Sequence, residues 1–150
     1  MQSITTLEGR DNHVGELAEI GIITTSDRAS SGQYEDRGGP AILGFFEEAI
    51  KSPVRVHYRC VSDEQKIIEN AIKELVEDIG CCVVVTTGGT GPTKRDVTPE
   101  ATAAVCDRIL DGFGEQMRSI SLAFVPTAIL SRQIGGTRDT CLIFNLPGRP

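Results

Sequence analysis

The chain has 150 residues, of which 39% are hydrophobic and 24% charged, and its formal net charge is -6. This length fits one domain, and the ordinary hydrophobic content excludes a disordered or collagen-like chain. The negative charge argues against nucleic acid or an anionic membrane as a partner, because both are polyanions. An anionic ligand would therefore need local positive charge from a metal, a helix N-terminus or a few basic side chains.

Residues 1–18 are polar, show no hydrophobic period and are predicted to form a flexible tail. Residues 19–150 form one predicted domain, in which short apolar runs alternate with amphipathic segments. Strands are predicted at 20–25, 54–60, 81–87 and 141–146, and helices at 40–51, 62–79, 98–109 and 113–123. Ser62 and Gln65 fit a capping box for the second helix, and Gly135-Gly136 fits a hairpin turn.

This alternation predicts a three-layer α/β fold with a mostly parallel sheet and a short antiparallel element near the C-terminus. The sequence stops shortly after the last predicted strand, where an α/β domain usually continues into a covering helix. We therefore expect that a C-terminal helix is missing from the chain.

Five cysteines occur, and none of them forms a C-x-x-C pair. We interpret them as reduced residues of the core, as is usual in the cytosol. The sequence has no secretory signal and no apolar run long enough to cross a membrane. These features predict a cytoplasmic protein.

Three glycines within four residues follow the most apolar predicted strand, in the segment Thr87-Gly88-Gly89-Thr90-Gly91. Consecutive amide N–H groups in such turns hold anions, and α/β sheets bind ligands at the carboxyl ends of their strands. The segment matches neither the Walker A pattern nor the dinucleotide fingerprint. Two interpretations stand: a phosphate-binding loop, or a tight turn that needs glycine for steric reasons.

Lys94, Arg95 and Asp96 come directly after this loop and just before a predicted helix. The two cations could neutralise phosphate oxygens. Asp96 could bind Mg²⁺, which takes one or two carboxylates together with phosphate oxygens. The alternative for Asp96 is electrostatic, because a carboxylate near a helix N-terminus stabilises the helix.

Polar residues also follow two other predicted strands: Asp63 after one, and Ser26, Asp27 and Arg28 after the other. For Asp63 the alternative is again a favourable acid in the first turn of a helix. Because the carboxyl ends of parallel strands meet at one edge, we expect these residues to lie near the glycine loop. The convergence predicts a site for phosphate chemistry. No zinc-ligand spacing and no Gly-x-Ser-x-Gly motif occurs, which argues against zinc chemistry and serine hydrolysis.

With these motifs, the sequence over residues 20–150 resembles the molybdopterin adenylyltransferases of molybdenum cofactor biosynthesis. The resemblance is carried by TTSDRASSG at 24–32, TTGGTGP at 86–92, RDVTPEAT at 95–102, GFGEQMR at 112–118, Ser131-Arg132 and NLPG at 145–148. It implies a homotrimeric enzyme that transfers AMP from Mg-ATP to the terminal phosphate of molybdopterin and releases pyrophosphate. ATP is then the co-substrate, Mg²⁺ the cofactor, and the molybdate-inserting enzyme of the pathway a further partner.

By position, the resemblance implies that Asp63 and Asp96 are the two essential aspartates, tied to Mg²⁺ and catalysis. It assigns the segment Thr87–Gly91, with Lys94 and Arg95, to the nucleotide phosphates. It implies that molybdopterin contacts Ser121, Ser131, Asn145, Pro147 and Gly148, and it leaves Ser26, Asp27 and Arg28 as further candidates. The alternative function is a MoaB-like module of the same fold that binds molybdopterin without catalysis. The paired aspartates favour the enzyme, because a pure binder of a polyanion has no need for them.

Overall fold

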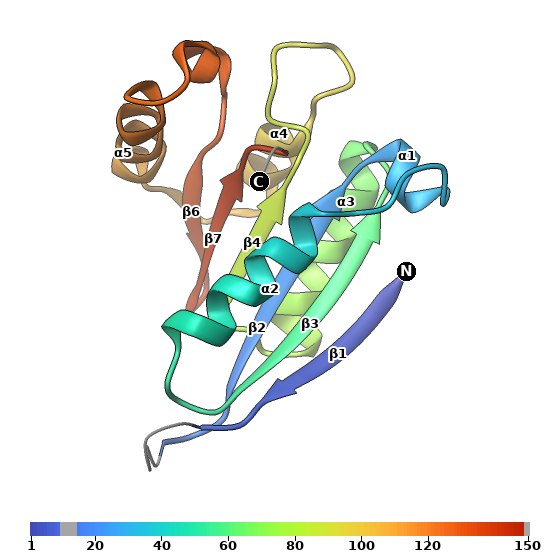
Figure 1. Cartoon of the computed structure of the whole chain (residues 1–150), viewed down its shortest axis with the longest axis vertical. Helices are drawn as coiled ribbons and strands as arrows, with labels where there is room; N and C mark the ends of the chain where they lie inside the picture. Colours follow the sequence, from blue (N-terminus) through green and yellow to red (C-terminus); the bar gives the residue numbers. More distant parts are fainter. Residues whose placement is uncertain (10–14, 149–150) are drawn as a thin grey trace.

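The computed structural model describes residues 1–9 and 15–148, and it contains one seven-stranded mixed sheet. The strands are β1 (Gln2–Leu7), β2 (Ala18–Thr25), β3 (Val54–Val61), β4 (Val83–Thr87), β5 (Arg108–Ile109), β6 (Gly135–Arg138) and β7 (Cys141–Leu146), in the spatial order β1-β3-β2-β4-β7-β6-β5. The central four are parallel, whereas β1, β6 and β5 run antiparallel to their neighbours. The predicted α/β fold is confirmed (Figure 1).

Helices cover the two faces of the sheet (Figure 1). They are α1 (Asp27–Ser30), α2 (Gly38–Ala49), α3 (Gln65–Lys73), the π-helical continuation η1 (Glu74–Asp78), α4 (Thr98–Val105), α5 (Asp111–Leu122) and the 3₁₀ helix η2 (Pro126–Leu130). One core cluster packs α3 and α4 against the sheet around Ile23, Ile72 and Val84, all fully buried. A second cluster packs α2 over Ile22 and Val56. Within the described residues, no helix is long and apolar enough to span a membrane.

The prediction of a flexible tail is wrong for residues 2–7, which form β1 and pair with β3 from Gln2–Arg59 to Leu7–Val54. Residues 10–14 of that predicted tail lie outside the described residues. The strand lacks a hydrophobic alternation because it lies at the sheet edge, where most of its side chains are exposed. Its stabilisation comes from main-chain pairing, which sequence patterning does not reveal.

The capping-box prediction is also wrong, because α3 starts at Gln65 behind Glu64, and no side chain caps it. The predicted hairpin turn at Gly135-Gly136 lies inside β6 instead, and the chain turns at Asp139, whose φ is 50°. The two glycines leave room for neighbouring side chains that a larger residue would contact too closely. A Cβ at Gly135 would lie 2.7 Å from the Cβ of Phe113, and one at Gly136 would lie 2.7 Å from the Sγ of Cys106.

Cys60, Cys81 and Cys141 are buried and Cys106 is half-buried, as expected of core residues, but Cys82 is exposed. All five thiols are free. Burial raises the pKa of Cys106 to about 11 and those of Cys81 and Cys141 to about 12, so these three stay protonated at neutral pH.

Candidate active site

The carboxyl ends of β2, β3 and β4 meet at one edge of the sheet, where the segments that follow them come together (Figure 1). This is the convergence that the sequence predicts. The glycine loop after β4 divides the edge into two sides. Asp63 and Asp96 lie on the side of Gly89 and Gly91, whereas Arg28 and Arg37 lie on the side of Gly88, where Asp36 is the carboxylate.

The loop itself needs glycine for steric reasons, as the second interpretation holds. Gly88 and Gly89 have φ of 95° and 64°. A Cβ at Gly88 would lie 2.4 Å from the main-chain oxygen of Thr25, and one at Gly89 would lie 2.3 Å from the Oγ1 of Thr98. The Gly88 amide donates to the carbonyl of Leu146 (3.2 Å), so this N–H is engaged within the protein.

Asp63 and Asp27 lock the ends of β3 and β2 together. The Asp27 amide donates to the Asp63 carboxylate (3.0 Å), and the Asp63 amide donates to the Asp27 carboxylate (3.0 Å). The second Asp63 oxygen, Oδ1, faces the loop, since a Cβ at Gly89 would lie 3.2 Å from it. Burial raises the pKa of the Asp63 carboxyl, and the charges of Asp27 and Asp96 push it in the same direction. This carboxylate is therefore a group that a bound cation would stabilise.

Arg95 bridges two carboxylates at this side rather than standing free for phosphate. It donates to both oxygens of Asp27 at 2.8 and 2.9 Å and forms an ion pair with Glu64 at 2.7 Å. The contact with Arg95 lowers the pKa of Asp27, which stays ionised. Lys94 is exposed beside it. Arg95 thus ties the segment after the glycine loop to the ends of β2 and β3.

Asp96 lies beside Gly91, where a Cβ would be 2.8 Å from its Oδ2. That oxygen accepts from the amide (3.0 Å) and the hydroxyl (2.6 Å) of Thr93. Arg132 fixes the same turn by donating to the main-chain oxygens of Gly91 (2.8 Å) and Asp96 (2.7 Å), and it pairs with Glu100. From sequence, Arg132 was named only as part of a motif. Its contacts with this turn join residues more than 30 positions apart in the chain, so no local pattern predicts them.

A polar crevice of about 240 Å³ lies on the other side of the loop. Its lining includes Ser26, Arg28 and Arg37 together with Gly88 and Gly148. Ser26 caps α1, since its hydroxyl accepts from the amide of Ala29 at 3.2 Å. The guanidinium of Arg28 lies 5.5 Å from the ring centroid of Tyr34. Sequence reasoning missed Arg37, which follows no motif and reaches the crevice because α2 begins next to it.

Asn145, predicted to contact molybdopterin, and Thr87, predicted to contact nucleotide phosphates, both make hydrogen bonds within the protein. Asn145 is fully buried, and its amide nitrogen donates to the hydroxyls of Thr86 and Thr102 at 2.9 Å each. These bonds connect β7 to β4 and α4 behind the glycine loop. Thr87 is likewise buried and donates to the main-chain oxygen of Pro147 at 3.0 Å, which holds the turn at 147–148 against the loop.

Ser131 and Ser121 lie at a distance in the chain from the glycine loop. The Ser131 hydroxyl donates to the side-chain oxygen of Gln133 at 2.8 Å, and Ser121 lies near the end of α5. Both are half-buried. The main chain next to Ser131 does reach the loop, because the amide of Arg132 donates to the carbonyl of Thr90 at 2.8 Å.

The carboxylates of Asp63 and Asp96 fit a metal ion that is bound jointly by the protein and the phosphates of a substrate, and not one that is fully coordinated by protein side chains. Among residues 1–9 and 15–148, no group of three histidine, cysteine or acidic side chains is placed to hold a metal. Two aspartates at the glycine loop fit Mg²⁺, which is commonly bound by one or two carboxylates plus substrate phosphates. The pKa of Asp63 is raised mainly by burial, and the neighbouring carboxylates of Asp27 and Asp96 raise it further.

Comparison with known proteins gives a consistent result. A family model described as "Probable molybdopterin binding domain" matches residues 21–150. Molybdopterin adenylyltransferase of Haemophilus influenzae is 57% identical over 134 residues, which cover 89% of this chain and 68% of the relative. The protein of the same name from Escherichia coli K12 is 57% identical over 131 residues, which cover 87% of this chain and 67% of the relative.

Solved structures agree on the fold. A structure of MogA has a TM-score of 0.80 at 38% identity and covers 88% of this chain and 85% of its own. MoaB from Thermus thermophilus has a TM-score of 0.79 at 36% identity. The match covers 89% of this chain and 82% of the MoaB chain. The match therefore covers nearly nine-tenths of this chain.

Proposed function

This chain belongs to the family of molybdopterin binding domains, and from that membership we infer that it is a molybdopterin adenylyltransferase of molybdenum cofactor biosynthesis. The single observation that carries the inference is the 57% identity to curated adenylyltransferases over nearly nine-tenths of the chain. In the reaction, a terminal phosphate oxygen of molybdopterin forms a bond to the α-phosphorus of ATP. The bond from that phosphorus to the bridging oxygen breaks, and its electron pair leaves with pyrophosphate.

No side-chain base is needed, because the attacking phosphate is already ionised at neutral pH. The protein's task is to position two polyanions and to balance their charge. We assign the metal to Asp63 and Asp96, whose carboxylates lie at Gly89 and Gly91. Mg²⁺ bound there would supply charge neutralisation for the reacting phosphates and the pyrophosphate.

The structure supports a revised assignment of the cations. Arg28 and Arg37 line the polar crevice with Gly88, and we propose that they bind nucleotide phosphates. We assign Arg95 a positioning role, because it is held by Asp27 and Glu64. Lys94 is exposed and remains a candidate for phosphate contact. These residues supply locally the positive charge that the acidic chain lacks overall.

We propose that molybdopterin approaches from the side of Ser121, Ser131 and the turn at Pro147 and Gly148. Gly148 packs on the loop, since a Cβ added at this position would lie 3.1 Å from the Cα of Gly88. Asn145 acts indirectly in this assignment by holding the buried threonines behind the site.

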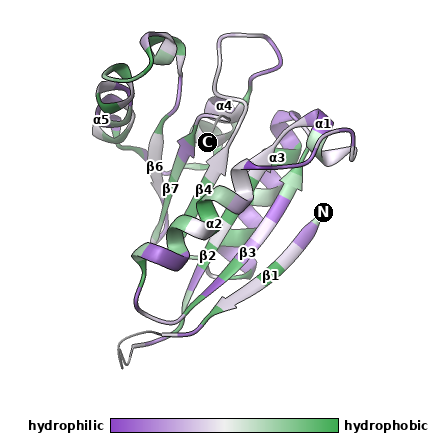
Figure 2. Cartoon of the chain, viewed as in Figure 1, coloured by the Kyte–Doolittle hydropathy of each residue, from purple (hydrophilic) through white to green (hydrophobic). Residues whose placement is uncertain are grey.

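We propose a homotrimer, in line with the resemblance, and the surface of α5 and η2 is the candidate interface. Seven large hydrophobic side chains are exposed on α5, on η2 and on the link between them: Phe113, Ile120, Leu122, Phe124, Val125, Ile129 and Leu130. In Figure 2, where the ribbon is coloured by hydropathy, α5 and the segment that follows it include stretches in the green of hydrophobic residues. Patches of this kind are typical of subunit interfaces. Phe124→Asp should reduce the mass of the assembly measured by light scattering, whereas Phe45→Asp on the exposed side of α2 should not.

We further propose that the enzyme works in the cytoplasm and delivers its product to the molybdate-inserting enzyme of the pathway. Five free thiols are compatible with a reducing compartment. The second candidate function is a MoaB-like module that binds molybdopterin without catalysis, and the family description "Probable molybdopterin binding domain" is compatible with it.

Incubating the full chain with ATP labelled at the α-phosphate and with molybdopterin tests the proposed function. We expect label on the pterin and one pyrophosphate released per label transferred. Tight binding of molybdopterin without labelling would favour the binding module and would contradict the enzyme.

A further inference from the structure

Asp96, one of the two aspartates assigned to the metal, lies at the end of an exposed turn. Residues 91–96 form neither a helix nor a strand, and the four at positions 92–95 are exposed. A carboxylate holds an ion well only where its own backbone is fixed, because ordering a flexible segment costs conformational entropy. The position of Asp96 therefore depends on contacts from outside the turn.

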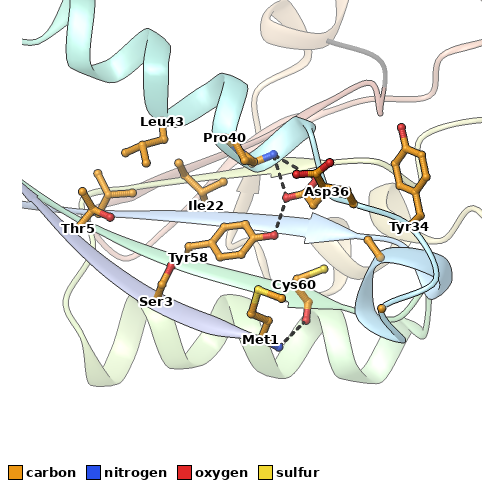
Figure 3. A pocket seen from close by; sticks show the side chains of 15 residues that line it. Met1, Ser3, Thr5, Ile22, Tyr34, Asp36, Pro40, Leu43, Tyr58 and Cys60 are labelled. Carbon is orange, nitrogen blue, oxygen red and sulfur yellow. Dashed lines mark hydrogen bonds between the residues drawn. The ribbon is translucent and has the colours of Figure 1, made fainter.

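Asp36, on the other side of the glycine loop, is held by the elements around it. Its Oδ2 accepts hydrogen bonds from the hydroxyls of Tyr58 and Thr24, and the amides of Gly38 and Gly39 also donate to this carboxylate. Figure 3 shows it beside Tyr58 in a mostly apolar cavity of about 480 Å³ between β1, β3 and α2. Asp36 is thus fixed by β2, β3 and the start of α2, whereas the exposed turn needs a support of another kind.

One side chain from a distant part of the sequence provides this support. The guanidinium of Arg132 donates through Nε to the carbonyl of Gly91 (2.8 Å) and through Nη2 to the carbonyl of Asp96 (2.7 Å). Its main-chain amide donates to the carbonyl of Thr90 (2.8 Å), and its Nη1 pairs with Glu100 in the first turn of α4. Arg132 thus bridges the first and last residues of the turn and ties them to α4.

The segment that carries Arg132 is itself held from behind. Arg118 of α5 donates to the carbonyls of Ser131 (3.4 Å) and Gln133 (2.8 Å). Gln133 is buried, and its side-chain oxygen accepts from the Ser131 hydroxyl at 2.8 Å. The guanidinium that bridges the turn therefore extends from a fixed base.

This arrangement uses the planar shape of the guanidinium. Its nitrogens Nε, Nη1 and Nη2 reach Gly91, Glu100 and Asp96 from one rigid fork. An ammonium group is a compact point charge on a flexible stem and cannot span the two carbonyls in this way. A lysine at position 132 would therefore keep the positive charge and lose the bridge.

We propose that Arg132 is a positioning residue for the metal, which fixes the main chain at Asp96 and so holds this carboxylate in place for the ion. The proposal rests on the proposed function and adds a residue that acts through Asp96. Groups that hold metal ligands from behind typically contribute about 10–100-fold to metal affinity or activity. The alternative role for Arg132, whose side chain is 38% exposed, is direct contact with a phosphate.

Arg132→Lys separates the two roles, because it keeps the charge and removes the bridge. The measurement is the Kd of ATP by calorimetry over a series of Mg²⁺ concentrations. We expect the Mg²⁺ concentration that gives half of the full enhancement of binding to rise about tenfold, with metal-free ATP binding as in the wild type. An unchanged Mg²⁺ dependence would overturn the proposal. Weaker metal-free binding with unchanged enhancement by Mg²⁺ would indicate a phosphate contact and would overturn it too.

Arg138 offers a matched control at the other end of the sheet, where it pairs with the first residue of β7. It donates to the main-chain oxygen of Val105 at 2.7 Å and pairs with Glu77, so it too joins a carbonyl and a glutamate. Arg138→Lys should lower the Tm about as much as Arg132→Lys and leave the Mg²⁺ dependence unchanged. An equal shift of Mg²⁺ dependence in both variants would indicate a general loss of structure and would overturn the proposal.

AMP transfer by the wild type separates this inference from the proposed function. Transfer by the wild type, with the same Mg²⁺ dependence of ATP binding in Arg132→Lys, refutes the role of Arg132 and leaves the adenylyltransferase intact. A shifted Mg²⁺ dependence in Arg132→Lys, without transfer by the wild type, supports the role of Arg132 and refutes the enzyme. Wild-type ATP binding that does not respond to Mg²⁺ would overturn the proposal together with the metal assignment.

Discussion

The two sides of the glycine loop differ in charge and in how firmly their side chains are held. On the side of Gly89 and Gly91, Asp27, Asp63 and Asp96 each accept hydrogen bonds from the protein. On the side of Gly88, the crevice contains Arg28 and Arg37, both exposed, and opens into an apolar cavity.

This separation indicates how an acidic protein can handle two polyanions. Carboxylates that are hydrogen-bonded and partly buried are suited to a cation, whereas exposed arginines are suited to phosphate oxygens that arrive and leave. If the two sets were mixed, they would pair with each other. Arg95 illustrates this outcome, because it lies on the acidic side and is bound by Asp27 and Glu64.

The largest effect is expected on the acidic side. Asp96→Asn keeps the size of the side chain and its bonds to Thr93 possible, but removes the charge assigned to the metal. We expect kcat for AMP transfer to fall by about 10²–10³-fold, as for the loss of other groups that stabilise charge in the transition state. Molybdopterin affinity should change little. Full activity in a steady-state assay would remove Asp96 from the mechanism.

A methyl group on the dividing loop should disturb both sides together. Gly89→Ala strains a residue with φ of 64° and brings a Cβ to 2.3 Å from the Oγ1 of Thr98. We expect unfolding free energy in urea to fall by about 3 kcal/mol. The matched control is Gly44→Ala in α2, where nothing lies within 4 Å, and it should stabilise by about 0.5–1 kcal/mol. Equal stability of the two variants would refute the steric role of Gly89.

Charge removal on the crevice side should act on binding rather than on catalysis. We expect the double substitution Arg28→Gln and Arg37→Gln to weaken ATP binding about 10- to 100-fold. Arg108→Gln removes the same type of charge from β5 and serves as the control. The measurement is the Kd of ATP by calorimetry, and an unchanged Kd in the double variant would contradict the assignment of phosphates to this crevice.

The smallest effect concerns the stability of the acidic side. Because burial raises the pKa of Asp63 above that in the unfolded chain, the folded state binds this proton more tightly. Ionisation at neutral pH therefore costs stability, which returns as the pH falls toward the folded-state pKa. Asp63→Asn should have a Tm at pH 7 equal to or above that of the wild type. The difference should shrink as the pH is lowered, and a strongly reduced Tm at pH 7 would contradict this.

Sequence patterning predicts the part of the site that depends on strand order. Asp63 and the glycines follow closely after strands whose hydrophobic character is clear, and Asp96 comes after the glycine loop. Their meeting at one edge follows from a parallel sheet. The resemblance adds their chemistry. For the loop, the structure bears out the steric interpretation at Gly88 and Gly89.

The parts that sequence does not predict depend on tertiary contacts. β1 is polar because it is an exposed edge strand, so it looks like a tail. Arg132 and Arg37 reach the site through packing that no local pattern encodes. Asn145 alternates correctly with its neighbours on β7, but only the packed structure reveals that its amide is buried between two threonines.

The most direct test of the division of charge is ATP binding measured with and without Mg²⁺ in two variants. One carries Asp63→Asn with Asp96→Asn, and the other carries Arg28→Gln with Arg37→Gln. We predict that the first variant loses the enhancement of binding by Mg²⁺ but keeps metal-free binding. The second should weaken binding by the same factor under both conditions. If Mg²⁺ still enhanced ATP binding in the aspartate variant as much as in the wild type, the acidic side would not be the metal site.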